Sequence, residues 1–200
     1  GLLNSDRGGI ILDPKVGLFD DVTELDFASL YPNIMLKFNI SPETMLCSCC
    51  KDSQIIVPQL GYNICTKHMG LLPEVLKPII ERRFCFKARA KNKKYNSKLY
   101  KEMQMAWKWI LIVCFGYTGY RNARYGRIEC HESITAFSRD IIVSAVNIAE
   151  ENGYDVLHGI IDSLWVRPKS KCSSPVRLSR EISSKTGIRM DVEGHYKWIV

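Results

Sequence analysis

The sequence lacks a long apolar run. The longest one, residues 109–117, is far shorter than the ~20 residues that a helix needs to cross a bilayer. The N-terminus lacks the basic and then apolar segments of a secretory signal, and the chain has no internal repeat or low-complexity segment. These absences predict a soluble intracellular protein, located in the cytoplasm, with no membrane partner.

Acidic residues are scarce in one part of the chain. Residues 77–108 contain eleven Lys and Arg but only two acids, a block charge of +9 in a chain whose net charge is +7. The spacing of Arg83, Lys87, Lys91 and Lys94 predicts that they share one helical face. Concentrated positive charge is typical of a surface that binds phosphate, in nucleic acid or in a nucleotide. A solvated helical face is the alternative interpretation.

The remaining composition is that of a globular protein. Of the 200 residues, 46% are apolar, enough to bury a core in one domain with an excursion or in two small domains. Eight cysteines are present, and in an intracellular protein they favour metal ligands or reduced core residues over disulfides. Four of them are scattered and are interpreted as core or filler residues: Cys85, Cys114, Cys130 and Cys172.

The pattern of apolar and turn-forming residues predicts both strands and helices. Residues 10–29 predict a strand, a turn and a second strand that ends at Asp26. Two helices joined by a short turn at Asn96 predict a projecting hairpin, and a third helix has an apolar stripe from Ile134 to Ile148. The predicted helices are residues 74–95, 98–115, 132–152 and 176–186, and the later strands are residues 156–160, 164–167, 188–192 and 196–200.

The nine residues from Asp26 to Ile34 are the most informative stretch. Asp26 ends an apolar strand and precedes a small, turn-prone, aromatic sequence, which places one carboxylate beside backbone amides. Asp26 alone is equally consistent with a capping residue. The whole stretch resembles the DxxSLYP motif of family B DNA polymerases. The resemblance implies that Asp26 binds catalytic metal, that Ser29 and Leu30 help to bind the nucleotide, and that Tyr31 excludes a ribose 2′-hydroxyl.

A second motif surrounds Asp162. Two aspartates at neighbouring strand ends can hold the two hard cations that phosphoryl transfer requires, although a turn residue is the simpler interpretation of either one alone. Residues 158–166 resemble the YGDTDSxxV motif of the same family. The resemblance implies two Mg²⁺ ions bound by Asp26 and Asp162. The first aspartate of the motif is replaced by Ile160, and its threonine by Ile161.

The basic hairpin resembles the same family. Residues 83–87 resemble its R-x-x-Φ-K element, and residues 104–120 resemble its QxAxK…YGYxGY motif. The resemblance implies that Arg83, Lys87 and Lys108 hold the incoming triphosphate, with each charged hydrogen bond contributing about 1.5–3 kcal/mol.

Three positions in the second of these motifs depart from the family. Its Asn-Ser pair is replaced by Ile112 and Val113, and one tyrosine by Phe115. Apolar side chains cannot donate to phosphate, so a triphosphate contact is lost. Without the tyrosine hydroxyl, a polar contact to the minor-groove edge of the nascent base pair is lost as well.

Metal-binding residue types cluster between residues 47 and 68. Cys47 and Cys50 form one closely spaced pair, and Cys65 and His68 form another. Two such pairs on loops match the tetrahedral Zn²⁺ sites that thiolate and imidazole ligands form. Cys49 is a spare cysteine that could replace either neighbour. A disulfide between Cys50 and Cys65, or simply reduced cysteines, are the alternatives.

The resemblance extends from about Gly8 to the C-terminus and implies an α+β fold: an antiparallel palm sheet backed by helices, with the helical hairpin inserted as the fingers. Nothing in the sequence resembles the family's exonuclease or thumb, so we expect a piece of a longer polymerase from a divergent archaeal branch. The implied divisions are a linker or fragment edge at residues 1–9, palm at 10–70 with a Cys-rich loop at 45–70, fingers at 71–118 and palm at 119–200.

The function implied by the resemblance is template-directed DNA synthesis in replication or repair, joining a dNTP to a primer 3′-hydroxyl with two Mg²⁺ ions. Primer–template DNA and dNTP are the implied partners, with a sliding clamp bound through regions outside this chain and a nucleoid location in a prokaryote. The replaced residues leave a second hypothesis, an inactive relative that binds DNA or acts as a replication or repair scaffold. A third, more distant hypothesis is a zinc-stabilised nucleic-acid-binding module whose acids are structural.

Overall fold

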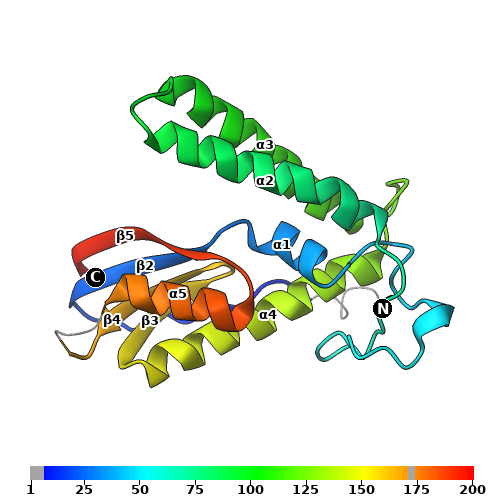
Figure 1. Ribbon diagram of the computed structural model, residues 1–200. Helices are drawn as coiled ribbons and strands as arrows, with labels where there is room; N and C mark the ends of the chain where they lie inside the picture. Colours follow the sequence, from blue (N-terminus) through cyan, green and yellow to red (C-terminus); the bar gives the residue numbers. More distant parts are fainter. Residues whose placement is uncertain (1–6, 171–173) are drawn as a thin grey trace. The chain divides into compact units, whose positions relative to one another are not determined.

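The computed structural model describes residues 7–170 and 174–200 and confirms the predicted α+β class (Figure 1). Residues 1–6 of the predicted linker and Cys172 lie outside the described residues. Within the described part of the chain, no helix is long and apolar enough to span a membrane. The elements are β1 (Ile11–Leu12), β2 (Phe19–Phe27), α1 (Leu30–Lys37), the short 3₁₀ helix η2 (Ser48–Cys50), α2 (Leu71–Lys91), α3 (Ser97–Thr118), α4 (Ile128–Glu151), β3 (Tyr154–Ile160), β4 (Ser163–Pro168), α5 (Pro175–Thr186) and β5 (Met190–Ile199).

The chain divides into two compact units. One contains Tyr31–Ala136, and the other contains Gly8–Leu30 together with Phe137–Val200. Helix α4 begins in the first unit and ends in the second. Its predicted apolar stripe is confirmed as buried, and consists of Ile134, Phe137, Ile141, Ala145 and Ile148.

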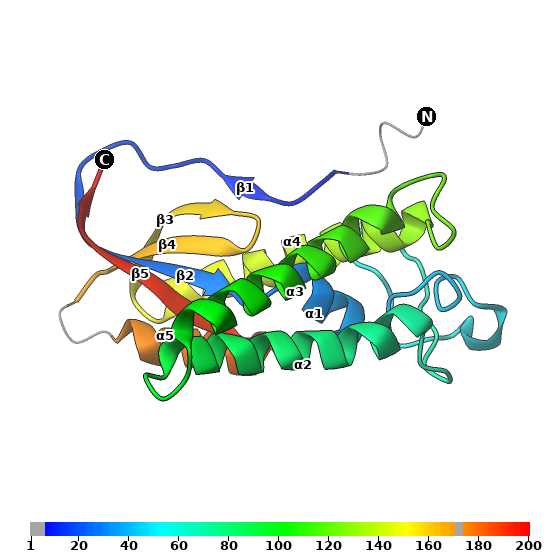
Figure 2. The same ribbon diagram turned by 90° about the horizontal axis from the view of Figure 1, so that it is seen from above.

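The second unit is built on a five-stranded antiparallel sheet in the order β1-β3-β4-β2-β5, with β1 at an outer edge beside β3 (Figure 2). Strand β2 is hydrogen bonded to β4 on one side and to β5 on the other. Leu25 and Phe27 of β2 are fully buried. Helix α5 packs on β5, where the Met190 amide donates to Ser183 Oγ at 2.8 Å.

The C-terminal residues form one strand, β5, and not the two short strands that were predicted. Gly194 pairs with Glu24, but the next pair is Val192 with Leu25, so Glu193 is an extra residue on β5. A bulge accommodates such a residue without ending the strand. The polar Glu193-Gly194 pair therefore interrupts the apolar pattern but not the hydrogen-bond ladder.

The first unit contains the predicted helical hairpin, in which α2 packs on α3 (Figure 1). The Asn96 side chain caps α3 by accepting a hydrogen bond from the Leu99 amide at 3.1 Å. Helix α2 ends at Lys91, so Lys94 lies in the turn, and the basic stripe on the helix is shorter than predicted.

A helix over Leu30–Lys37, α1, was not predicted. Ser29, which precedes it, adopts a left-handed backbone with φ 54°, an uncommon conformation for a residue other than glycine. Pro32 lies in the first turn of the helix, where the backbone amide that proline lacks is not needed. Only Ala28 and the left-handed Ser29 thus separate the end of β2 from the start of α1.

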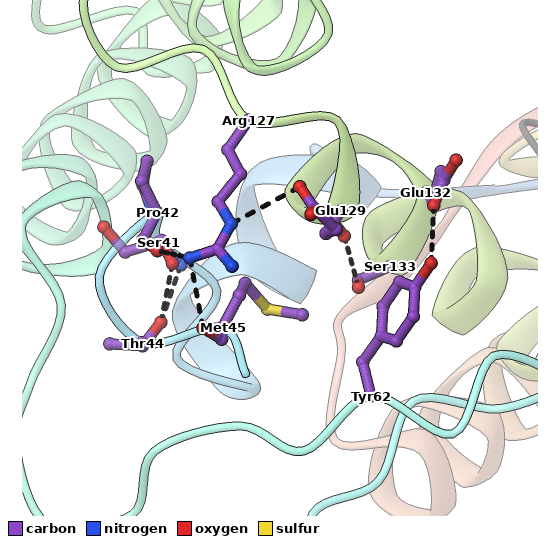
Figure 3. A network of polar contacts seen from close by, with 9 residues as sticks. All are labelled: Ser41, Pro42, Thr44, Met45, Tyr62, Arg127, Glu129, Glu132 and Ser133. Carbon is purple, nitrogen blue, oxygen red and sulfur yellow. Dashed lines mark hydrogen bonds and ion pairs between the residues drawn. The ribbon is translucent and has the colours of Figure 1, made fainter. Parts of the chain in front are cut away.

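The segment after α1 is held by Arg127, which lies just before α4 (Figure 3). Its guanidinium donates to the carbonyl of Pro42 and to that of Met45 at 3.1 Å, and it pairs with Glu129 at 3.3 Å. Nearby, the Tyr62 hydroxyl donates to the buried carboxylate of Glu132 at 3.1 Å. Burial and the hydrogen bond to Glu132 both raise the pKa of Tyr62.

The Arg127 contacts make a prediction about stability. Replacing Arg127 with Met should lower the free energy of unfolding by about 1.5–3 kcal/mol, because the Pro42 and Met45 carbonyls lose a charged donor. Urea unfolding of this chain measures the change. Arg124→Met is the matched control, since Arg124 is exposed and contacts the Tyr125 ring; its effect should stay within about 0.5 kcal/mol. Equal losses in the two variants would contradict the assigned role of Arg127.

Candidate active site

The central strands place the two predicted aspartates at neighbouring strand ends. Asp26 pairs across the sheet with Ser163, the residue after Asp162. The Phe27 amide donates to the Asp162 carbonyl at 2.8 Å, which links the two chain segments directly. The Ser163 hydroxyl donates to Asp26 Oδ1 at 2.8 Å. Both aspartates are partly exposed, so solvent reaches part of each residue.

The turn before Asp162 has an unusual backbone. Ile161 has φ 54°, which a β-branched residue adopts only under strain. The Ile161 amide donates to the Ile10 carbonyl at 3.0 Å, and the Asp162 amide donates to the Ile160 carbonyl at 2.6 Å. These hydrogen bonds fix the backbone of the turn and therefore the position of Asp162.

A third carboxylate lies across the sheet from Asp26. Asp191 on β5 is its register partner, and directly opposed residues of an antiparallel pair point to the same face. Arg189 Nε pairs with Asp191 Oδ1 at 2.8 Å. Neither Ser163 nor Asp191 was singled out from the sequence. Both residues could be identified only once the pairing of β2 with β4 and β5 is known, because each lies opposite Asp26 in that pairing.

Tyr31 lies at one end of a row of three rings, and its own ring is tilted by 48° to that of Phe115. Its ring centroid is 4.3 Å from that of Phe115, which in turn stacks on His131 at 4.4 Å with an interplanar angle of 20°. Gly119 makes room for His131, since a Cβ atom there would lie 2.8 Å from Nδ1. No sequence motif pointed to His131, because its contact with Phe115 arises only where residues of α3 and α4 pack together.

The three predicted triphosphate ligands differ in exposure. Arg83 is buried, with 8% of its surface exposed, whereas Lys87 is half-buried and Lys108 is exposed. Arg83 and Lys87 are one turn apart on α2, and Lys108 is on α3. The hairpin thus carries all three cations within one unit.

The apolar replacements on α3 are exposed. Ile112 and Val113 expose 44% and 48% of their surfaces, and Ile112 lies one turn after Lys108 on the same helical face. Ile160, at the end of β3, exposes 38%. None of these three side chains fills a core position.

The cysteine loop gathers four thiols. The sulfur atoms of Cys47, Cys49, Cys50 and Cys65 all lie within 4.8 Å of one another, and each is a free thiol. His68, a predicted ligand, is exposed and lies outside this group, which contains Cys49. The backbone amide of Thr66 lowers the pKa of Cys50 to about 6, despite the opposing effect of burial.

The sequence matches the model of DNA polymerase family B over residues 4–175. The chain belongs to this family. It is 40% identical over 195 residues to DNA polymerase 2 of Saccharolobus solfataricus, and 33% identical over 197 residues to the DNA polymerase of Archaeoglobus fulgidus. These alignments cover 98% and 96% of this chain but 28% and 25% of the relatives.

A solved structure agrees with this assignment. The family B DNA polymerase from Pyrobaculum calidifontis has a TM-score of 0.75 and 34% sequence identity to this chain. The match covers 96% of this chain and 26% of that structure. The chain therefore spans about a quarter of the length of its family B relatives.

Proposed function

We propose that this chain supplies the catalytic palm and the nucleotide-binding fingers of a polymerase that performs template-directed DNA synthesis. In this reaction the primer 3′-hydroxyl attacks a dNTP and displaces pyrophosphate. The proposal depends chiefly on one observation, that Asp26 and Asp162 come from strand ends joined by the Phe27–Asp162 and Ser163–Asp26 hydrogen bonds. Primer–template DNA and dNTP are the proposed ligands.

The donor set fits Mg²⁺, because two partly exposed carboxylates supply the hard oxygen ligands that this ion prefers. Two bound Mg²⁺ ions would activate the attacking hydroxyl and stabilise charge on the leaving oxygen. Ser163 orients one oxygen of Asp26, and the strained turn at Ile161 fixes Asp162. Two well-positioned carboxylates are what the protein must contribute to this chemistry.

The remaining side chains are proposed to hold the nucleotide. Tyr31, supported by the Phe115 ring, would lie under the sugar and reject a 2′-hydroxyl, with Ser29 and Leu30 shaping the turn that presents it. Arg83 and Lys87 on α2 would neutralise the triphosphate. Lys108 on α3 would add a third charge.

The alternative function is a non-catalytic polymerase relative that binds DNA or scaffolds replication or repair. Ile160, Ile112 and Val113 favour it, because exposed apolar groups stand where the family motifs have polar ones. We favour catalysis because both aspartates remain. Contact with a sliding clamp, through regions outside this chain, and a nucleoid location are part of the same proposal.

The aspartates provide the direct test. In the full-length protein, Asp26→Asn or Asp162→Asn should reduce primer extension with Mg²⁺ by roughly a thousand-fold, since metal-ion catalysis contributes several kcal/mol. Asp155→Asn is the control, because Asp155 lies toward the other end of β3 and pairs with Lys169 at 3.5 Å. Extension that persists in both active-site variants would refute the two-metal assignment.

The contact between Tyr31 and Phe115 makes a prediction about sugar selection. Tyr31→Ala should raise ribonucleotide incorporation relative to deoxyribonucleotide incorporation by about tenfold or more, because a steric block is removed. Phe115→Ala should shift the ratio in the same direction but less, since it removes only the ring that supports Tyr31. Tyr95→Ala, in the turn of the hairpin, should leave the ratio unchanged. If Tyr31→Ala discriminates between ribonucleotides and deoxyribonucleotides as well as the parent protein does, Tyr31 does not exclude the 2′-hydroxyl.

The replaced residues make the prediction that separates an enzyme from a scaffold. Ile160→Asp and Ile112→Asn should each speed primer extension in the full-length protein by about 10- to 150-fold, the equivalent of a charged hydrogen bond worth about 1.5–3 kcal/mol. Ile110→Asn is the matched control, because Ile110 is also exposed on α3 but on the opposite face from Lys108.

The background rate of primer extension is measured with Asp26→Ala added to the parent protein and to each of these variants. If the doubly reverted protein extends primers no faster than this background, the catalytic proposal fails. DNA binding that survives in the same preparations, measured by fluorescence anisotropy, would then favour the scaffold.

A further inference from the structure

Four sulfur atoms in the first unit are spaced as the ligands of a single metal ion would be. Cys49 Sγ lies 3.7 Å from both Cys50 Sγ and Cys65 Sγ, and the last two are 3.9 Å apart. Cys47 Sγ completes the group, with all four atoms within 4.8 Å. Four thiolates arranged tetrahedrally at 2.3 Å from one Zn²⁺ would lie ~3.8 Å from one another.

The same distances argue against the other fates of these cysteines. A disulfide between Cys50 and Cys65 needs sulfur atoms ~2.0 Å apart. It would not explain why the sulfur atoms of Cys47 and Cys49 lie in the same group. At most two thiolates share one iron atom in an iron–sulfur cluster, and the others are separated by iron and sulfide. Three sulfur atoms within 3.9 Å of one another therefore do not fit such a cluster.

Neighbouring polar groups support the thiols as ligands. Thr66 Oγ1 donates to Cys50 Sγ at 3.7 Å, and Asn63 Nδ2 donates to Cys47 Sγ at 3.8 Å. Asn63 Nδ2 also donates to the Cys47 carbonyl at 3.0 Å and to the Cys50 carbonyl at 2.9 Å, so it clamps both ends of the turn that carries the first thiols. Outer hydrogen bonds of this kind orient metal ligands.

Local charge also suits a tetrathiolate site. Zn²⁺ with four thiolates leaves a net charge of roughly −2. Lys51 and Lys67 line the surface pocket beside Cys49 and Cys50. Both lysines are exposed, and Asp52 lines the same pocket, so the side chains around it carry a net positive charge that partly offsets the charge of the site.

We propose that Cys47, Cys49, Cys50 and Cys65 bind one structural Zn²⁺ as a four-thiolate site, with Cys49 in the position that the sequence assigned to His68. The ion closes the loop between residues 47 and 65, in which eight residues are exposed and only four are buried. The closed loop supports the start of α2, because Asn39 Nδ2 donates to the Cys65 carbonyl at 2.8 Å while Asn39 Oδ1 accepts from the Gly70 amide at 2.7 Å. This role does not depend on polymerase activity.

The test is X-ray absorption and elemental analysis of this chain, purified without chelator. We expect about one zinc per chain, with four sulfur ligands at ~2.3 Å and no nitrogen ligand at ~2.0–2.1 Å. This measurement needs no variant, so it stands even where a substitution prevents folding. Three sulfurs and one nitrogen, iron in place of zinc, or a Cys50–Cys65 disulfide in metal-free protein would each overturn the proposal.

Variants then assign the fourth ligand. His68→Ala should keep about one equivalent of zinc, whereas Cys49→Ser should lose it after dialysis against a competing chelator. Cys85→Ser is the matched control, since Cys85 is also an exposed free thiol but lies on α2. Zinc that is retained in Cys49→Ser and lost in His68→Ala would restore the histidine and refute the four-thiolate site.

Discussion

The antiparallel pairing of β2 with β4 and β5 is the constraint on which the candidate active site depends. Because β2 is hydrogen bonded on both sides, its register cannot slip by one residue without moving Leu25 and Phe27 out of the core. The same register sets Asp26 opposite both Ser163 and Asp191. The position of one carboxylate is thus determined by the burial of its neighbours along the strand.

How far the sequence alone could predict this arrangement differs from element to element. Strand β2 and the buried stripe of α4 were predictable, since each has the periodicity of a half-buried element. Helix α1 was not, because a left-handed Ser29 starts it and no local pattern predicts that conformation. The single strand β5 was split in the prediction because a bulge at Glu193 looks like a turn when the partner strand is unknown.

Some residues of the candidate site could likewise be proposed from the sequence, and others could not. Motif resemblance could propose Asp26, Tyr31 and Asp162, but no motif could place His131 behind Phe115 or choose between Cys49 and His68. Both outcomes depend on contacts between residues that are distant in the sequence. His68 has the expected spacing, but it lies outside the group of four thiols, whereas Cys49 Sγ lies 3.7 Å from Cys65 Sγ.

The replaced motif residues are best understood through their exposure. An apolar residue that moves into a core position gains burial, about 25 cal/mol per Å² of apolar surface, and such a gain would explain Ile112, Val113 and Ile160 as stabilising changes. All three expose more than a third of their surfaces, so little of that gain is available to them. Their lost polar groups are therefore not offset by folding stability. Under the proposed function these replacements would weaken triphosphate binding, whereas under the non-catalytic alternative they would offer apolar surface to a partner.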